Sequence, residues 1–223
     1  MSKLWSLKPR NILVLVDNES WIIPYAKKLV NLIKQEGDNA KFIKNHENIT
    51  KNSICFILGC INIIPKIYLQ KAYKALVIHE SALPLGKGFS PLSWQIIEGK
   101  NQIPICLFEA NNKVDSGNII FKDLISFAGH ELIDELRQKQ GNKTIDLCMK
   151  FVRSKKIPKS LPQLGDETFY NLRKPEDSEL NINKSIESQF NLLRIVDNDK
   201  YPAFFWYNGL KYKLNIKKWK TDE

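Results

Sequence analysis

The chain has 223 residues, of which 43% are hydrophobic. This content suits one globular α/β domain that folds without disulfide or metal staples. No stretch reaches the roughly 18 apolar residues needed to span a bilayer, and residues 1–10 have no apolar core of signal-peptide length. The four cysteines lack zinc-binding spacing. We therefore expect a cytoplasmic protein with reduced thiols, no membrane contact and no metal.

The formal net charge of +10 is open to three interpretations. It can reflect only a lysine- and asparagine-rich surface, it can attract small polyanions such as a diphosphate, or it can bind nucleic acid. No RNP, zinc-finger or basic-helix pattern supports the third interpretation. We therefore expect no nucleic-acid partner.

Short apolar runs alternate with helical patterns over the first two thirds of the chain. Such alternation predicts an α/β fold with a Rossmann-like, mainly parallel sheet and flanking helices. Ligands of such sheets bind beyond the carboxyl ends of the strands, where we expect His79 and the loop around Asp115. Strands are predicted at 11–16, 41–43, 53–58, 75–79, 104–108 and 118–121, and helices at 21–35, 65–73, 91–98 and 127–152.

The chain changes character after about residue 155, where prolines interrupt it. A helical pattern resumes at 177–193. Two strand-like runs, 203–207 and 210–214, then flank an Asn-Gly pair, which is the strongest short-range signal for a β-hairpin. We predict a core domain at 1–155 and a small C-terminal extension with a helix and a β-hairpin at 156–223.

Two short motifs carry candidate chemistry. His79 ends a predicted strand, and Asp115-Ser116-Gly117 lies on a later loop. Alone, such a histidine is commonly structural and such a tripeptide is commonly a turn. Together on neighbouring strand ends, an imidazole and a carboxylate can hydrogen-bond, and the carboxylate then fixes the imidazole tautomer. A pair of this kind serves proton transfer and oxyanion stabilisation.

At these residues the sequence resembles the folate-dependent formyltransferases, which include the methionyl-tRNA, glycinamide-ribonucleotide and sugar N-formyltransferases. The matching features are His79, the Leu83-Pro84 loop with Gly88, and Asp115-Ser116-Gly117. The separation also matches, because Asp115 follows His79 by 36 residues. The wider resemblance covers roughly residues 10 to 130. One position departs from the pattern. The family has an asparagine two residues before the histidine, and here that position is Val77.

The departure at Val77 removes an amide that the family uses to donate a hydrogen bond to the formyl oxygen. Losing one oxyanion donor typically costs about 10²- to 10³-fold in rate. Backbone N–H groups of 82–88 are one set of candidate substitutes. The candidate side chains are Ser81, Asn111, Asn112 and Ser116.

The resemblance implies N10-formyltetrahydrofolate as the formyl donor and His79 and Asp115 as the catalytic residues, without a metal or a covalent intermediate. A protonated His79 would stabilise the oxyanion, and Asp115 would hold His79 and help to pass the amine proton to the folate nitrogen. The folate would lie along residues 105–112, where Phe108 either contacts it or only packs in the core. Lys87 would contact an anionic part of a substrate, or it is simply a solvated loop lysine. The implied folate-contacting side chains are Phe108, Asn111 and Asn112.

The tail indicates the acceptor. Its Arg173-Lys174-Pro175-Glu176-Asp177 segment and the run from Tyr201 resemble the sugar N-formyltransferases. Only about 65 residues follow the long predicted helix, which are too few for the C-terminal barrel domain of methionyl-tRNA formyltransferases and its linker. The implied acceptor is a nucleotide-linked amino sugar, such as a dTDP-4-amino-4,6-dideoxyhexose, used for surface polysaccharide such as the O-antigen of lipopolysaccharide. Tyr201, Trp206 and Tyr207 can stack on the base or simply pack the hairpin.

The resemblance also implies a homodimer formed through the C-terminal region. Two alternatives to a sugar N-formyltransferase stay open. One is an amine formyltransferase of the glycinamide-ribonucleotide kind. The other, suggested by Val77, is a folate- or nucleotide-sugar-binding protein that has lost catalysis.

Overall fold

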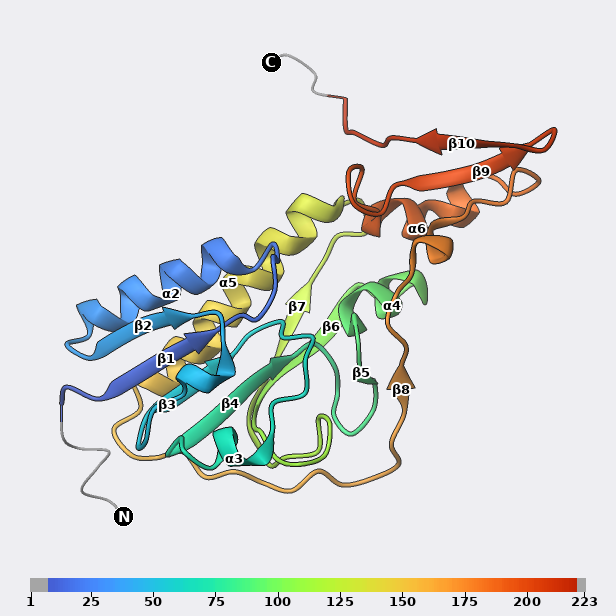
Figure 1. The fold of residues 1–223 in the computed structure, drawn as a ribbon. Coiled ribbons are helices and arrows are strands. Elements are labelled where there is room, and N and C mark those ends of the chain that lie inside the picture. Colours follow the sequence, from blue (N-terminus) through green and yellow to red (C-terminus); the bar gives the residue numbers. More distant parts are fainter. Residues whose placement is uncertain (1–7, 220–223) are drawn as a thin grey trace.

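The computed structural model describes residues 8–219 and is built around one six-stranded sheet (Figure 1). The first four strands are parallel, as the alternation of strands and helices predicts. The mainly parallel, Rossmann-like α/β fold is therefore confirmed. In spatial order the strands are β2 (Asn39–Ile43), β1 (Asn11–Leu15), β3 (Ile54–Ile57), β4 (Lys74–His79), β6 (Gln102–Glu109) and β7 (Ile119–Ser126).

The second half of the sheet reverses direction. β6 runs antiparallel to β4, with His79 opposite Cys106 and Leu76 opposite Glu109, and β7 runs antiparallel to β6. The loop that follows β6 therefore starts near the amino end of β4. Our expectation that His79 and Asp115 share the carboxyl ends of neighbouring parallel strands is wrong. The β6–β7 connection is a hairpin, which needs no crossover helix.

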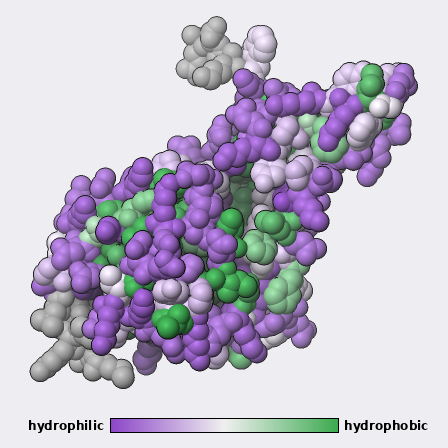
Figure 2. Space-filling view, in the orientation of Figure 1, coloured by the Kyte–Doolittle hydropathy of each residue, from purple (hydrophilic) through white to green (hydrophobic). Residues whose placement is uncertain are grey.

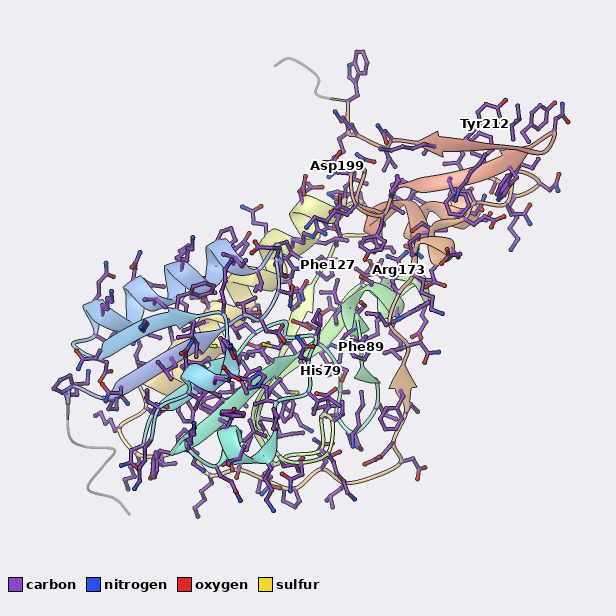
Figure 3. All side chains as sticks on the ribbon, viewed as in Figure 1. His79, Phe89, Phe127, Arg173, Asp199 and Tyr212 are labelled. Carbon is purple, nitrogen blue, oxygen red and sulfur yellow. The ribbon has the colours of Figure 1, made fainter. Side chains whose placement is uncertain are left out.

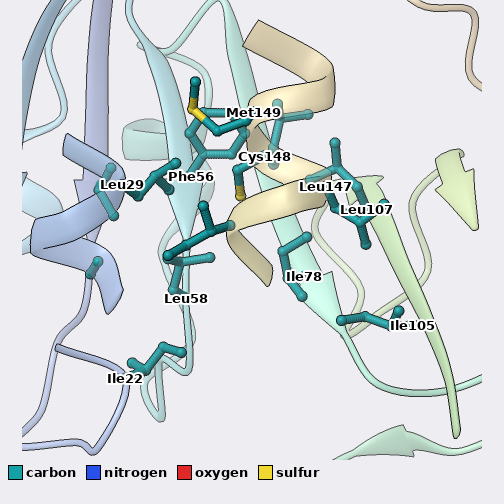
Figure 4. Packing of buried hydrophobic residues seen from close by; sticks show 14 of the residues in the cluster. Ile22, Leu29, Phe56, Leu58, Ile78, Ile105, Leu107, Leu147, Cys148 and Met149 are labelled. Atoms are coloured by element: carbon teal, nitrogen blue, oxygen red, sulfur yellow. The ribbon is translucent and has the colours of Figure 1, made fainter. Parts of the chain in front are cut away.

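The main core lies between the sheet and two long helices, α2 (Ile23–Gln35) and α5 (Ile133–Val152). α2 presents a buried apolar stripe at helical spacing, because residues three and four apart lie on one face. Leu29 on this stripe is fully buried, and it gathers with Phe56 of β3 and Met149 of α5 (Figure 4). The stripe consists of Ala26, Leu29, Val30 and Ile33.

α5 begins at Ile133, six residues later than predicted. The preceding residues form a turn in which the Glu131 carboxylate accepts hydrogen bonds from the amides of Ala128 and Gly129. Burial alone would raise the pKa of Glu131, but these amides and Lys139 outweigh burial and hold the pKa far below its usual range. The fully buried Arg194 also contacts this carboxylate, at 3.3 Å. A buried charge cluster therefore replaces the first helical turns.

Other predicted helices are shorter than expected. The pattern at 65–73 gives only α3 (Lys66–Leu69), whereas 91–98 closely matches α4 (Pro91–Ile97). The predicted helix at 177–193 is largely wrong, because the chain there forms short turns and one six-residue helix. Its helical elements are η2 (Pro175–Ser178), η3 (Glu187–Gln189) and α6 (Phe190–Ile195). A short η1 (His46–Asn48) precedes β3. None of the helices within residues 8–219 is long and apolar enough to cross a membrane.

Residues 155–174, which we call the strap, run back along the core (Figure 1). In the strap, β8 (Phe169–Tyr170) pairs in parallel with β5 (Lys87–Gly88), and Leu161 bridges to Ile119. The backbone of the C-terminal extension thus bonds directly to the core. The boundary at residue 155 stays a prediction.

The predicted hairpin is confirmed residue for residue as β9 (Ala203–Tyr207) and β10 (Leu210–Leu214). Asn208 and Gly209 both have positive φ angles, as the tight turn requires. The inner end of the hairpin packs on α6 through Ala203, Leu193 and Val196. The hairpin projects from the rest of the molecule, and hydrophilic residues cover most of the face shown in Figure 2.

Candidate active site

His79 is the last residue of β4, and its side chain is only 7% exposed. Its Nε2 lies 2.8 Å from the carbonyl oxygen of Gly86, on the loop that follows β4. Because a carbonyl oxygen only accepts hydrogen bonds, Nε2 must carry the proton of this bond. Gly86 therefore fixes the orientation of the ring and leaves Nδ1 facing the other way.

Asp115 reaches His79 because the loop between β6 and β7 folds back across the sheet. Its Oδ2 lies 3.7 Å from His79 Nδ1 and accepts a hydrogen bond of 2.9 Å from the Gly88 amide. Gly117 is required in this loop, because a Cβ there would lie 1.6 Å from the backbone oxygen of Glu109. The sequence correctly predicts that the two side chains meet, although the route differs from the one expected.

The spacing of this pair suits proton handling. A distance of 3.7 Å is too long for a direct hydrogen bond, so Nδ1 and Oδ2 are neighbours with room to rearrange. A ring protonated on both nitrogens matches both surroundings, since Nε2 faces a carbonyl and Nδ1 faces a carboxylate. The arrangement can hold a proton at Nδ1 and present it to a third group.

Val77 lies two residues before His79 and packs in an apolar cluster. Its neighbours there are Leu83, Cys106, Phe108 and Ile119. The valine side chain has no group that can donate a hydrogen bond. Phe108, expected to contact folate, is 1% exposed and belongs to the same cluster.

The candidate substitute donors differ in how their polar groups are used. Ser81 has a buried hydroxyl without a hydrogen-bond partner among the described residues. The Ser116 hydroxyl donates to Val114 and accepts from Lys87. Asn111 and Asn112 are exposed on the loop. Among these candidates, Ser81, which lies two residues after His79, is therefore the one whose hydroxyl is still available to donate a hydrogen bond.

Lys87 is buried rather than a solvated loop residue. Its Nζ lies 2.5 Å from Glu167 of the strap and donates to the Ser116 hydroxyl at 2.8 Å. It also lies over the ring of Phe169, 5.9 Å from the centroid. Lys87 therefore ties the loop after His79 to the loop of Asp115 and to the strap.

Tyr201, Trp206 and Tyr207 lie at the hairpin and not beside His79. Figure 3 shows His79 within the core and Tyr212 of the hairpin well away from it. Trp206 and Tyr207 are about half exposed, and Trp206 borders a shallow surface hollow with Leu180 and Ile182. Within one chain, these aromatic residues and His79 do not form one site.

Glu80 was not singled out from the sequence, although an acid directly after a strand-end histidine is a usable signal. Burial raises its pKa, and Asp115 adds to the rise, while a hydrogen bond with Gln140 and the nearby His79 oppose it. A second ionisable carboxyl therefore sits next to the His79–Asp115 pair. Among residues 8–219, no group of three or more His, Cys, Asp and Glu side chains could hold a metal ion.

Two strap residues were also missed. The side chain of Gln163 donates hydrogen bonds of 2.8 Å to the backbone oxygens of Asp115 and Gly117. The hydroxyl of Thr168 accepts a 2.8 Å bond from the Gly86 amide. No sequence signal points to either residue, because both lie far along the chain in a segment without periodicity.

The fold and this site define a class: α/β proteins in which an imidazole and a carboxylate are held together over a mainly parallel sheet. The family model for formyl transferase matches residues 26–149, more than half of the chain. The chain belongs to the formyl transferase family. The resemblance read from the sequence is thereby confirmed, and with it a formyl-transfer enzyme class.

Solved structures agree with this assignment. Methionyl-tRNA formyltransferase from Clostridium thermocellum superposes with a TM-score of 0.78 at 25% identity, covering 95% of this chain and 94% of that one. A sugar N-formyltransferase from Shewanella gives 0.68 at 14% identity, covering 96% and 99%. HypX from Aquifex aeolicus, solved with tetrahydrofolic acid, gives 0.71 at 16% identity, covering 92% and 37%. The last two likenesses concern the fold alone.

Proposed function

We propose that this protein transfers a formyl group from N10-formyltetrahydrofolate to the amino group of a nucleotide-linked amino sugar. The candidate acceptor is a dTDP-4-amino-4,6-dideoxyhexose destined for surface polysaccharide such as O-antigen. The single observation that carries the proposal is the approach of His79 to Asp115, 3.7 Å apart, in a member of the formyl transferase family.

The reaction balances without any other reagent. The neutral amine nitrogen attacks the formyl carbon and forms a new C–N bond, and the carbonyl electron pair moves to oxygen. As the tetrahedral intermediate collapses, the bond from carbon to N10 of the folate breaks. One amine proton moves to N10, so the products are the formamide and tetrahydrofolate.

His79 and Asp115 are the proposed catalytic residues. The proton at His79 Nδ1 would stabilise the oxyanion, while the Gly86 carbonyl keeps the ring in place. Asp115 stabilises the protonated ring and would relay the amine proton toward N10. Glu80 adds a second carboxyl nearby. The proposed roles of His79 and Asp115 use atoms that already face each other, His79 Nδ1 and Asp115 Oδ2.

The position of Val77 requires another donor for the formyl oxygen. Ser81 is the proposed donor, because its buried hydroxyl is without a partner among residues 8–219. Backbone amides of 82–88 remain the alternative. If neither donates, the rate is expected to be about 10²- to 10³-fold below that of an enzyme with the amide.

The amino-sugar acceptor is supported by the tail motif and by the Shewanella enzyme, which matches this chain over nearly the whole length of both. Lys87, Phe108, Asn111 and Asn112 stay proposed contacts of folate or of an anionic group. Tyr201, Trp206 and Tyr207 stay proposed contacts of the nucleotide. Because they lie at the hairpin and away from His79, these contacts require that a second chain supplies the hairpin or that the hairpin moves. A homodimer through the hairpin and a cytoplasmic location remain part of the proposal.

Methionyl-tRNA is a second candidate acceptor. The Clostridium thermocellum methionyl-tRNA formyltransferase is matched over 94% of its chain by this protein. The two chains are thus of comparable length, so chain length does not separate a tRNA acceptor from a sugar acceptor. At 25% identity this likeness is stronger than that of the sugar enzyme.

A direct assay separates the candidates. The purified protein is incubated with N10-formyltetrahydrofolate and, separately, with dTDP-, UDP- and GDP-linked amino sugars, glycinamide ribonucleotide and methionyl-tRNA, and the products are identified by mass spectrometry. Formylation of an amino-sugar nucleotide is expected. Formylation of methionyl-tRNA alone would replace the acceptor, and ligand binding without any turnover would indicate a binding protein.

A further inference from the structure

The strap hydrogen-bonds to Asp115 directly and is linked to His79 through Gly86. On the Asp115 side, the amide nitrogen of Gln163 donates to the backbone oxygens of Asp115 and Gly117, each at 2.8 Å. A side-chain amide has two N–H groups, so one nitrogen satisfies both carbonyls. Gln163 thereby brackets the turn that carries the carboxylate.

That turn needs external support. Asp115 has φ +47°, in the left-handed region that residues with a Cβ rarely adopt. This backbone conformation aims Oδ2 at the Gly88 amide and toward His79. Such conformations persist where surrounding contacts fix them. Gln163 supplies such contacts, on the carbonyls of Asp115 itself and of the second residue after it.

The strap acts on the His79 side through Gly86. The Thr168 hydroxyl accepts from the Gly86 amide at 2.8 Å, while the Gly86 carbonyl accepts from His79 Nε2 at the same distance. The backbone adds a bond of 2.9 Å from the Lys87 amide to the Thr168 carbonyl. The residue that orients the imidazole is thus itself held by the strap.

We propose that Gln163 and Thr168 are positioning residues for formyl transfer, Gln163 holding Asp115 and Thr168 holding the Gly86 carbonyl that orients His79. The proposal rests on the proposed function of that pair. It means that the segment after residue 155 completes the reactive geometry and is more than an appendage. A displacement of about 1 Å at reacting groups can cost about 10²-fold in rate.

The first test needs no substrate. Gly88 donates its amide proton to Asp115 Oδ2, so its hydrogen exchange, followed by NMR, reports whether Asp115 stays in place. Gln163→Ala removes the donor, and Gln163→Glu keeps the length while placing an acceptor against two carbonyls. Both are expected to speed exchange at Gly88 by about tenfold or more. Gln138→Ala, at an exposed glutamine of α5, is the matched control and is expected to leave the rate unchanged.

The second test is kinetic. Gln163→Ala and Thr168→Val are expected to lower kcat by about 10- to 100-fold, with the KM for folate within about threefold of wild type. Gln163→Ala added to Asp115→Asn is expected to cause less than about a twofold further loss, because Gln163 acts through Asp115.

Unchanged Gly88 exchange in both Gln163 variants, or a full additional loss of kcat in the double variant, would overturn the proposal. If the wild-type protein formylates no amine while the Gln163 variants still speed hydrogen exchange at the Gly88 amide, the proposed function fails and the positioning role stands. The two failures are therefore distinguishable.

Discussion

The two halves of this molecule are built in different ways. The first part of the sheet, β1 to β3 with α2, is specified by short apolar runs and a helical stripe that pack locally. The reactive half, around His79 and Asp115, is specified by contacts between residues far apart in the chain, such as Gln163 with Asp115. The comparison teaches that stability and reactivity are carried by separate residues, which substitutions can test.

The largest effect is expected in the reactive half. His79→Gln should lower the rate of formyl transfer by about 10³-fold or more, because it removes the group that carries the proton. The free energy of unfolding should change little, since glutamine can still donate to the Gly86 carbonyl. Steady-state kinetics and thermal denaturation measure the two quantities. His130→Gln, at an exposed histidine, is the control; a variant that loses stability and activity in parallel would break the comparison.

The next effect concerns the ion pair that links the core to α6. Glu131→Gln leaves the buried Arg194 without its carboxylate and should lower the free energy of unfolding by about 3–5 kcal/mol. The pKa of Glu131 is lowered in the folded protein, so its contribution is present at neutral pH and is lost as pH falls through the acid range. Urea denaturation should thus show the wild-type advantage shrinking toward low pH, with exposed Glu176→Gln unaffected.

A change in the locally specified core should do the reverse of the His79 substitution. Leu29→Ala removes a fully buried side chain from the α2 stripe and should cost about 2–5 kcal/mol of unfolding free energy. The rate per folded molecule should stay near that of wild type, because Leu29 makes no contact with the reactive pair. Leu124→Ala, at a leucine that is 49% exposed, is the control for denaturation. A tenfold loss of kcat in folded Leu29→Ala would contradict the separation.

The smallest effect is expected at Glu80. Burial raises its pKa in the folded protein, so ionisation opposes folding and wild-type stability declines as pH rises above the ordinary glutamate range. Glu80→Gln removes that penalty. The difference in unfolding free energy should therefore move in favour of the variant as pH rises above the ordinary glutamate range. A difference that is independent of pH would show that Glu80 does not titrate in this range.

Sequence reasoning succeeds where periodicity or a strong turn signal acts within about ten residues. The strands that end at Leu15, Ile57 and His79, and the hairpin around Asn208, follow from such local signals. The histidine–aspartate pair was predicted from the motif and its spacing. The strands and the hairpin depend little on the rest of the chain, whereas the pair is also held by strap residues far along it.

The remainder depends on contacts that no local pattern records. The direction of β6 is set by pairing with β4, and an apolar strand pattern reads the same in either direction. The early residues of the predicted helix at 127 instead form a turn around Glu131, because Arg194, far along the chain, supplies a buried charge. Gln163 and Thr168 belong to the same class, since polar residues of a strap show no periodicity.

The central claim is that His79 and Asp115 act as one unit. A double-mutant cycle for formyl transfer, comparing His79→Gln, Asp115→Asn and the combined variant, tests it most directly. His79→Gln is expected to lose about 10³-fold or more in kcat and Asp115→Asn about 10²-fold or more. The combined variant should be no slower than the worse single one by more than about threefold. Fully multiplicative losses, or near wild-type turnover in either single variant, would contradict the claim.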